Sequence, residues 1–418
     1  MELKKYSNGL RLIVNENNST NVVAFKIFVD VGSKDEGVGE FGYAHFLEHM
    51  FFRSTKNYKQ NESLKLLDGL GVSKNAYTGI NHTCYYFKCI SSVLEEVIKI
   101  FSNMFFNLDY DKQEILNEKN VIIQEYKMGK DDYEKQAIEN ALLSMFKNTP
   151  LGHSPIGTPS TIKKVTSNKL KEFKQKHYLP EKVVISVSGA VNSKQIQQLI
   201  QTYFVSEFNN KATNHQNPIK EIACSKFSRY ITFKHKTQQT NVAILYNLKE
   251  LTKREQKTYD LLFAILGRGM SSKLFEEVRE KMGAVYHISA VFEKLCNNHF
   301  GEIFFSTSPQ KVKDTLMQIK SIIEQVANGD VTQDELQRVK NQVVTAFEYS
   351  RETNSSIAEI NGTELLEENK ILNEQQEINE YNKITTSQIS ECAKRLLKNN
   401  EYVVCAVGDC NKTNIMVY

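Results

Sequence analysis

The sequence repeats itself weakly, and this constrains the fold more than any other feature. The run TNVVA at residues 20–24 returns as TNVAI at 240–244, and VVISVSGAVNSKQI at 183–196 returns as VVCAVGDCNKTNI at 403–415. Between these runs, EILNEKNVIIQEY at 114–126 resembles ELQRVKNQVVTAF at 335–347. Three matches in the same order, at offsets of 219 to 221, indicate two copies of one structural unit.

A polar segment separates the two copies. Residues 206–221, SEFNNKATNHQNPIKE, are rich in Asn and poor in apolar residues, which is typical of a linker. We therefore predict a first domain at 1–205, a linker at 206–221 and a second domain at 222–418. Each copy mixes strand-like runs, such as 22–31, with amphipathic helical runs, such as 161–177 and 311–328. This predicts an α+β fold of two homologous units, each a mainly antiparallel sheet with helices packed against it.

Composition excludes several classes of protein. The 418 residues are 40% hydrophobic and 24% charged, with a formal net charge of +4, which is typical of a globular protein and not of a nucleic-acid binder. No apolar run approaches the roughly 20 residues that span a membrane. The start of the chain reads as a strand rather than as a signal or transit peptide. Seven cysteines without a CxxC pair favour free thiols, so we expect a cytoplasmic location.

The stretch HFLEH at residues 45–49 suggests a metal site. His45 and His49 are four residues apart, so on a helix both imidazoles lie on one face within reach of one ion. Glu48 stands where zinc peptidases carry a general base, and the order H-x-x-E-H is a known metal-peptidase signature. The alternative is two core histidines that are satisfied by hydrogen bonds. The second copy has AILGR at the matching positions, which favours a function rather than a packing role.

A catalytic zinc site needs a third protein ligand. Residues 112–128, KQEILNEKNVIIQEYKM, are expected to form a helix on which Glu118 and Glu125 point the same way, because they are seven residues apart. Spacing alone cannot separate a ligand from a solvated surface carboxylate, so both interpretations stay open at this point.

The chain resembles the pitrilysin/insulysin family of zinc metallopeptidases, which includes the mitochondrial processing peptidase. HFLEH is followed after 76 residues by the Glu of VIIQE, as in that family. Further matches cover most of the chain: VGSKDE, RST, NAYTG, TCYYF, PIGT, HYLPEKVVISVSG and, in the second half, LGRGMSSKLFEEVREKMGAVY. Two departures are Asn81, where the family often has a glutamate, and Arg268 within a run of glycines.

The resemblance implies a role for each matching residue. His45, His49 and Glu125 would bind Zn²⁺, Glu48 would be the general base, and Glu118 would orient a ligand. Arg279 and Tyr286, from the second half, would contact the substrate. The implied substrate-binding edge strand carries three further positions, Asn75, Ala76 and Tyr77.

The resemblance also implies an activity and an assembly. We expect a zinc endopeptidase that hydrolyses short or unfolded peptides inside a clamshell chamber, which family members build from four homologous units. This chain has two such units. It carries both the HFLEH motif, called the metal box below, and Arg279 with Tyr286, called the Arg/Tyr pair. We therefore expect a homodimer, with no membrane or nucleic-acid partner. The alternatives are a peptide-binding or scaffold subunit without turnover, and the catalytic half of a heterodimeric processing peptidase.

Overall fold

The computed structural model describes residues 1–208, 222 and 227–418, so most of the predicted linker lies outside the described residues. The chain forms two compact units. The first unit comprises residues 1–126, 153–218 and 348–372, and the second unit comprises 127–152, 219–347 and 373–418. Each unit therefore takes a segment from the opposite half of the sequence.

A six-stranded sheet forms the centre of the first unit, with the strand order β1-β2-β6-β3-β5-β4. Strands β2 and β6 are parallel, and every other neighbouring pair is antiparallel. The strands are β1 (Glu2–Lys5), β2 (Arg11–Glu16), β3 (Val22–Val29), β4 (Ser73–Thr78), β5 (Thr83–Ile90) and β6 (Val183–Gly189).

The second unit contains a five-stranded sheet of the order β7-β11-β8-β10-β9. Here β7 and β11 are parallel and the remaining pairs are antiparallel, as in the first sheet. The strands are β7 (Tyr230–Lys234), β8 (Thr240–Leu248), β9 (Val285–Leu295), β10 (Asn298–Thr307) and β11 (Tyr402–Gly408). Two largely antiparallel sheets with packed helices confirm the predicted α+β fold class.

The runs that repeat in the sequence occupy matching places in the two sheets. Strand β3 contains residues 22–24 and β8 contains residues 240–244, while β6 and β11 end at the matched glycines, Gly189 and Gly408. The second sheet therefore has the strand order of the first without β1. The homology of the two halves and their boundaries at 205 and 222 remain a prediction. The compact units are defined by contacts in space, whereas the predicted halves are defined by similarity in sequence.

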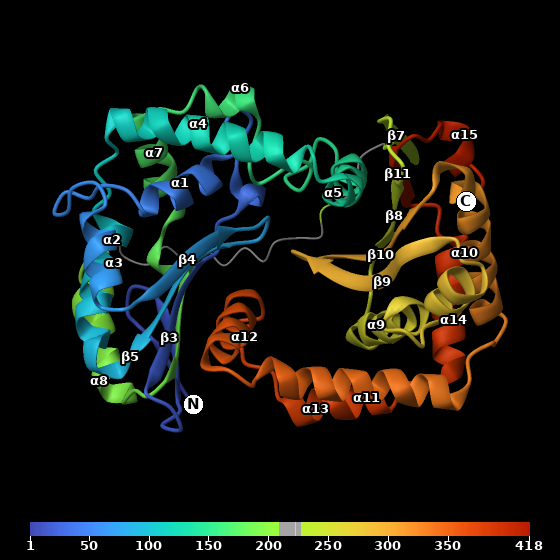
Figure 1. The fold of residues 1–418 in the computed structure, drawn as a ribbon. Coiled ribbons are helices and arrows are strands. Elements are labelled where there is room, and N and C mark those ends of the chain that lie inside the picture. Colours follow the sequence, from blue (N-terminus) through green and yellow to red (C-terminus); the bar gives the residue numbers. More distant parts are fainter. Residues whose placement is uncertain (209–221, 223–226) are drawn as a thin grey trace. The chain divides into compact units, whose positions relative to one another are not determined.

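The two faces of the first sheet are covered differently. One face packs against the main apolar core, whose helices include α1 (Tyr43–Phe51), α2 (Glu62–Gly69), α3 (Leu94–Phe106), α7 (Ser167–His177) and α8 (Ser193–Ile200). The opposite face carries α12 (Asn354–Glu367), which packs on β3 and β6 (Figure 1). Leu365 of α12 lies in a small apolar cluster with Phe28 and Val184 of the sheet.

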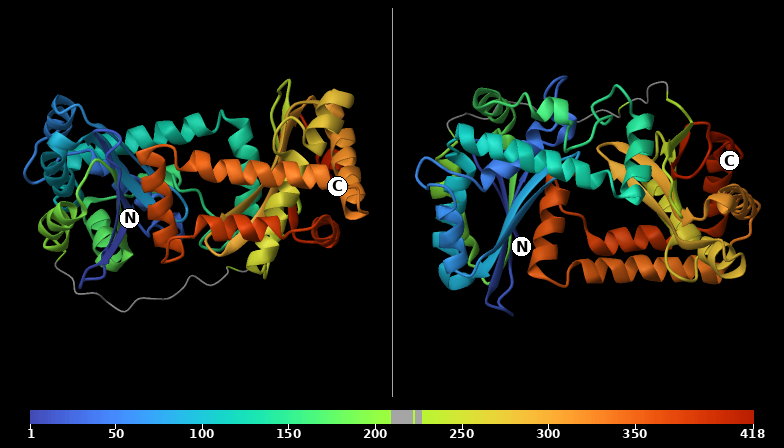
Figure 2. Two further views of the ribbon diagram at one scale, coloured as in Figure 1. Left: turned by 90° about the horizontal axis from the view of Figure 1, so that it is seen from below. Right: turned by 45° about the horizontal axis from the view of Figure 1, so that its top comes forward.

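The second sheet has the corresponding arrangement. One face packs against a core that includes α9 (Lys253–Gly267), α10 (Val312–Ala327), α11 (Gln333–Ser350) and α14 (Thr386–Lys398). The other face carries α5 (Tyr133–Met145), which contacts β8 and β11 (Figure 2). The remaining helices are α4 (Lys112–Gly129), α6 (Pro159–Ile162), α13 (Glu374–Asn382) and α15 (Lys412–Ile415). Each half of the sequence thus supplies one helix to the sheet of the other half.

Helical periodicity predicted two of three long helices correctly and missed a break in the third. The predicted helices at 112–128 and 311–328 are observed as α4 and α10. The predicted helix at 161–177 is instead divided into α6 and α7. The break is local, because the side chain of Thr166 accepts a hydrogen bond from the backbone N–H of Lys169 and so begins a new helix.

Within the described part of the chain, no helix combines the length and the apolar character that crossing a membrane requires.

Glu302 of β10 is a buried carboxyl group in the second unit. Burial, together with the nearby Glu293 and Glu134, raises its pKa to about 7. Because this pKa is higher in the folded state, stability is largest below the ordinary pKa of 4.5 and falls as the pH rises towards about 7.

We expect Glu302→Gln to remove this pH dependence. At pH 4.5 the parent and the variant should unfold with nearly equal free energies. At pH 8 the variant should be more stable by about 2–3 kcal/mol. Urea unfolding at the two pH values measures this difference, and a gap that is the same at both would contradict the assignment.

Candidate metal centre

Helix α1 carries the two histidines on a rigid foundation. Tyr43, Phe46, Leu47 and Met50 are all buried in the core, so one face of α1 is fixed against the sheet. The helix begins after Gly42, whose φ of 95° is a conformation that favours glycine. Consequently the polar face of α1, with both histidines, is held in one orientation.

A buried carboxylate stabilises the start of α1. The two oxygens of Glu36 accept hydrogen bonds from the backbone N–H groups of Gly42 and Ala44, each at 2.8 Å. A ring nitrogen of His153 lies 3.1 Å from the same carboxylate, and Phe41 stacks on the imidazole. This carboxylate compensates the unpaired N–H groups and the positive end of the helix dipole. His153 therefore supports the start of α1 through Glu36.

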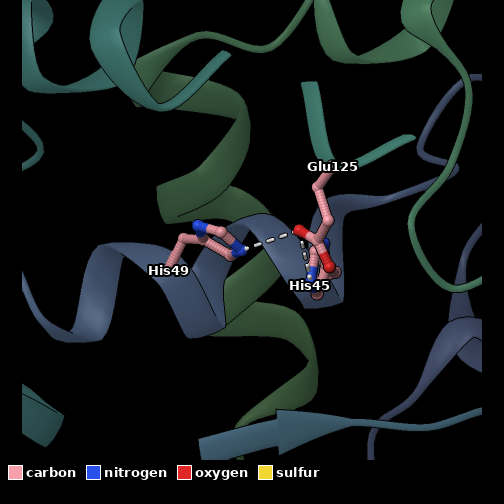
Figure 3. Close-up of side chains that lie close together, drawn as sticks. All are labelled: His45, His49 and Glu125. Atoms are coloured by element: carbon pink, nitrogen blue, oxygen red, sulfur yellow. Dashed lines mark ion pairs between the residues drawn. The ribbon is translucent and has the colours of Figure 1, made fainter. Parts of the chain in front are cut away.

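His45, His49 and Glu125 meet at one point in the first unit (Figure 3). The Nε2 atoms of His45 and His49 lie 3.7 Å and 3.5 Å from Oε2 of Glu125. Tetrahedral zinc with bonds of about 2.1 Å separates its ligand atoms by about 3.4 Å. The spacing and the donor types both fit a single zinc ion. Among the described residues, this is the one group of three such side chains close enough to hold a metal ion.

Glu118 orients the second imidazole. Nδ1 of His49 lies 2.9 Å from Oε2 of Glu118, a contact in which the imidazole donates and which turns Nε2 towards Glu125. The other oxygen of Glu118 forms an ion pair with Arg53. The carboxylate is only 1% exposed, so this guanidinium offsets much of the cost of burying it. We did not anticipate Arg53, although it opens the RST motif.

The charges around the site favour a cation. Burial alone would lower the pKa of His49, but hydrogen bonds to Glu118 and Glu125 and the charge of Glu48 raise it to about 9. Without a metal ion, the imidazole of His49 therefore holds a proton, and this proton supplies the positive charge that the carboxylates favour. These carboxylates make the surroundings of the two imidazoles electronegative.

Glu48 lies beside the three candidate ligands. Its Oε2 is 3.9 Å from Nε2 of His45 and accepts a hydrogen bond of 3.1 Å from the hydroxyl of Thr78. Burial raises the pKa of Glu48, while His49 and Thr78 oppose that rise. A carboxylate with a raised pKa next to a metal site is suited to accept and return a proton. Thr78 belongs to the NAYTG motif, but the sequence contained no sign of its contact with Glu48.

The three predicted substrate-strand residues lie on β4. Asn75, Ala76 and Tyr77 pair with β5, and β4 is the last strand of the first sheet. Its outer side therefore has no strand partner within the described residues. An unpaired strand edge can accept an extended peptide through main-chain hydrogen bonds. The same strand reaches the metal centre through Thr78.

Arg279 and Tyr286 lie together in the second unit. The Arg279 guanidinium is 4.5 Å from the ring centre of Phe275 and 5.4 Å from that of Tyr286. Tyr286, near the start of β9, is 83% exposed. The structure thus forms two groups from the predicted residues: the candidate metal centre with β4 in the first unit, and Arg279 with Tyr286 in the second.

The order H-x-x-E-H is the reverse of the commoner H-E-x-x-H motif. A helix with this reversed motif is the signature of one class of metallopeptidases. Two family models match the chain: "Insulinase (Peptidase family M16)" at residues 11–159 and "Peptidase M16 inactive domain" at 164–343. The chain belongs to the insulinase family, peptidase family M16, which confirms the family resemblance.

Curated relatives that match most of the chain are named as zinc proteases. The protein named "Uncharacterized zinc protease YmxG" from Bacillus subtilis is 28% identical and covers 94% of this chain and 95% of its own length. An "Uncharacterized zinc protease" from Rickettsia bellii is 29% identical over 84% of each chain. The similarity of this chain to two proteins that are named zinc proteases supports a protein of the zinc-protease type.

Solved structures match the fold. A protease from Helicobacter pylori superposes with a TM-score of 0.88 at 23% identity and covers 97% of this chain and 99% of its own. The first half of the periplasmic protease PqqL from Escherichia coli gives a TM-score of 0.79 at 21% identity, covering 100% of this chain and 93% of its own. At these identities the similarity establishes the architecture alone.

Proposed function

We propose that the protein is a zinc endopeptidase that hydrolyses peptide bonds in short or unfolded peptides. One observation carries the proposal: two imidazoles and a carboxylate lie at tetrahedral spacing, with Glu48 beside them. His45, His49 and Glu125 would hold the ion. Zinc, when bound, supplies Lewis-acid chemistry by lowering the pKa of water and polarising a carbonyl group.

The side chains of the protein would divide the remaining work. Glu48 takes a proton from the attacking water and returns it to the leaving amine. Thr78 holds the Glu48 carboxylate by its hydrogen bond. Glu118 and Arg53 keep the imidazole of His49 turned to the metal position. Arg279 and Tyr286 would donate hydrogen bonds to the carbonyl oxygen as negative charge develops on it.

Substrate recognition would use the edge of the first sheet. The peptide lies along β4, where Asn75, Ala76 and Tyr77 offer main-chain groups. Because these groups are common to all residues, the site accepts many sequences, provided that the segment is extended. Folded proteins are excluded, since their backbones are already paired. Leader peptides of the kind cut by the mitochondrial processing peptidase are one fitting substrate class.

We further propose a cytoplasmic homodimer that encloses its substrate. The cysteines of the described residues are free thiols, which suits a reducing compartment: Cys84, Cys89, Cys296, Cys392, Cys405 and Cys410. The chain carries both the metal box and the Arg/Tyr pair, so it needs no partner of a different sequence. Measuring the mass in solution tests this, and a monomer, or a dimer formed only with a different chain, would contradict it.

A second candidate is a peptide-binding subunit without turnover. The words "inactive domain" in the family description of residues 164–343 favour it for the second half. The complete His45, His49 and Glu125 group favours catalysis for the first half. Zinc analysis separates the two, because a pure binder has no reason to hold one zinc per chain.

The activity itself is tested by exposing a peptide mixture to the purified protein. We expect mass spectrometry to find internal cleavage of many peptides, its loss with a chelator, and its return with added zinc. Cleavage that persists in the chelator, or a mixture left intact by zinc-loaded protein, would contradict the proposal.

A further inference from the structure

The substrate-edge strand is held from two sides. Ala76 packs against the main core of the first unit, and Thr78 contacts Glu48. Tyr77, between them in sequence, points to the opposite face, because side chains alternate along a strand. There it packs against the small apolar cluster that includes Leu365 of α12. The face of β4 away from the metal therefore meets a helix supplied by the second half of the sequence.

A polar network joins β4 to this helix. The Tyr77 hydroxyl donates a hydrogen bond to Oε1 of Glu359 at 2.5 Å, and Nζ of Lys26 lies 2.6 Å from Oε2. The ring nitrogen Nε2 of His82 is 3.1 Å from the same hydroxyl. Both carboxylate oxygens of Glu359 are thus engaged, one by the edge strand β4 and one by β3, which lies on the far side of β5.

The burial of this network makes it specific. The Lys26 side chain is 7% exposed and that of Glu359 is 33% exposed. Burial, then the neighbouring Cys84 and Glu359, raises the pKa of Tyr77, so its hydroxyl stays protonated and remains a donor. Removing one member leaves the others buried with an unpaired polar group, which costs more than the bond itself contributes.

Helix α12 also comes unusually close to the sheet. A Cβ added at Gly362 would lie 2.1 Å from Cε2 of Phe28 on β3. Only glycine permits this approach, and it brings Glu359, one turn earlier on the same helix, within reach of Tyr77.

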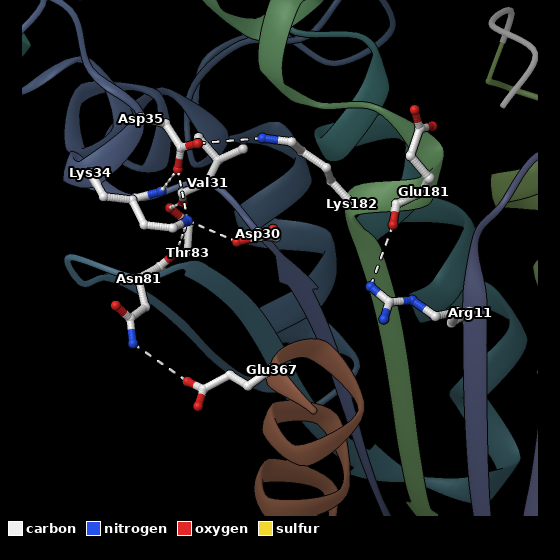
Figure 4. Close-up of polar contacts among 11 residues, drawn as sticks. Arg11, Asp30, Val31, Lys34, Asp35, Asn81, Thr83, Glu181, Lys182 and Glu367 are labelled. Atoms are coloured by element: carbon white, nitrogen blue, oxygen red, sulfur yellow. Dashed lines mark hydrogen bonds and ion pairs between the residues drawn. The ribbon is translucent and has the colours of Figure 1, made fainter. Parts of the chain in front are cut away.

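A second contact reaches the turn that follows β4 (Figure 4). Nδ2 of Asn81 lies 3.4 Å from Oε1 of Glu367, two turns beyond Glu359 on α12. The same turn is fixed from the other side by Lys34, whose Nζ donates to the backbone oxygen of Asn81 at 2.7 Å and to Asp30 at 2.7 Å. The β4–β5 hairpin is thus tied to α12 at its strand and at its turn.

We propose that Glu359 is a positioning residue that acts through the Tyr77 hydroxyl to hold β4 in place for its substrate. This inference rests on the proposed peptidase function. The second half of the sequence would then contribute to the metal-binding unit directly, through α12.

The test compares Glu359→Ala, which removes the acceptor of the Tyr77 hydrogen bond, with Tyr77→Phe and with the double variant. In each we expect KM for a peptide that the parent cleaves to rise about 5- to 20-fold, with kcat changed less than about 2-fold and zinc content unchanged. A purely structural role would instead lower the active fraction, which reduces apparent kcat and leaves KM alone. Because both residues act through one hydrogen bond, the double variant should resemble the more affected single variant.

A control and an activity-independent measurement complete the design. Glu401→Gln removes a carboxylate that pairs with Lys249 at 2.7 Å in the second unit, and KM should not change. Hydrogen exchange of the amides by which β4 pairs with β5 should accelerate at least about 10-fold in the Glu359 and Tyr77 variants. The exchange of the α1 amides should stay at the parental rate.

Three results would overturn the proposal. They are a KM that does not change in either single variant, a KM increase in the double variant equal to the product of the two single increases, and unchanged hydrogen exchange in β4. A parent protein that cleaves nothing would instead contradict the proposed function. In that case the exchange measurement alone decides whether Glu359 holds the strand.

Discussion

Glu48→Gln is expected to lower kcat by about 10²- to 10⁴-fold while the protein keeps its zinc. Glutamine has nearly the size of glutamate and can still accept the hydrogen bond from Thr78. It cannot take a proton from the attacking water. Peptide cleavage measured at saturating zinc, together with elemental analysis of the same sample, gives both quantities.

Glu96→Gln is a suitable control for this experiment, because Glu96 is an exposed residue of α3. It should leave kcat and zinc content at parental values. If Glu48→Gln cleaved peptides as fast as the parent, another group would have to accept the proton and the mechanism would be wrong. Loss of zinc in this variant would likewise show that Glu48 is not only a base.

His49→Ala is expected to weaken zinc binding by more than about 100-fold and to abolish cleavage. Losing a residue that hydrogen-bonds to a metal ligand typically costs 10- to 100-fold in metal affinity. Losing the ligand itself should cost more. Glu118→Gln, which retains the shape of that outer partner, should therefore fall in the range of about 10- to 100-fold. Competition with a zinc-binding dye measures the affinities of both variants.

His235→Ala provides the matched control, because His235 lies in the second unit, where its ring centre is 5.0 Å from that of Tyr133. Its zinc affinity should equal that of the parent. An affinity in His49→Ala close to the parental value would exclude this imidazole as a ligand. If Glu118→Gln lost more affinity than His49→Ala, the carboxylate of Glu118 would be the ligand instead.

The candidate metal centre could largely be predicted because its pattern is local. His45 and His49 share a helix, and a spacing of four residues places them on one face whatever the rest of the chain does. Glu118 and Glu125 share another helix. The meeting of these two helices was implied by the family resemblance, since spacing alone does not reveal which helices pack together.

The groups that support the centre could not be predicted in this way. Thr78, Arg53 and Glu36 act on Glu48, Glu118 and the start of α1 through contacts formed only in the folded chain. Each has a residue type that is common on protein surfaces. A lone threonine or arginine in a sequence therefore carries no sign of the partner that it meets.

The fold shows the same division. Strand and helix patterns predicted the α+β class, the strand at 22–31 and the helices at 112–128 and 311–328, because periodicity reflects burial on one face. They could not show that α5 packs on the second sheet and α12 on the first. Tyr77 and Glu359 are 282 residues apart in sequence, and an amphipathic helix can pack on either sheet. Only the tertiary structure determines that choice.

X-ray absorption at the zinc edge, on protein loaded with one equivalent of zinc, tests the central claim most directly. We expect two imidazole nitrogens at about 2.0–2.1 Å and a carboxylate oxygen at about 2.0–2.2 Å, with one imidazole fewer in His49→Ala. Sulfur ligands at about 2.3 Å, or an imidazole count that does not change in His49→Ala, would contradict it.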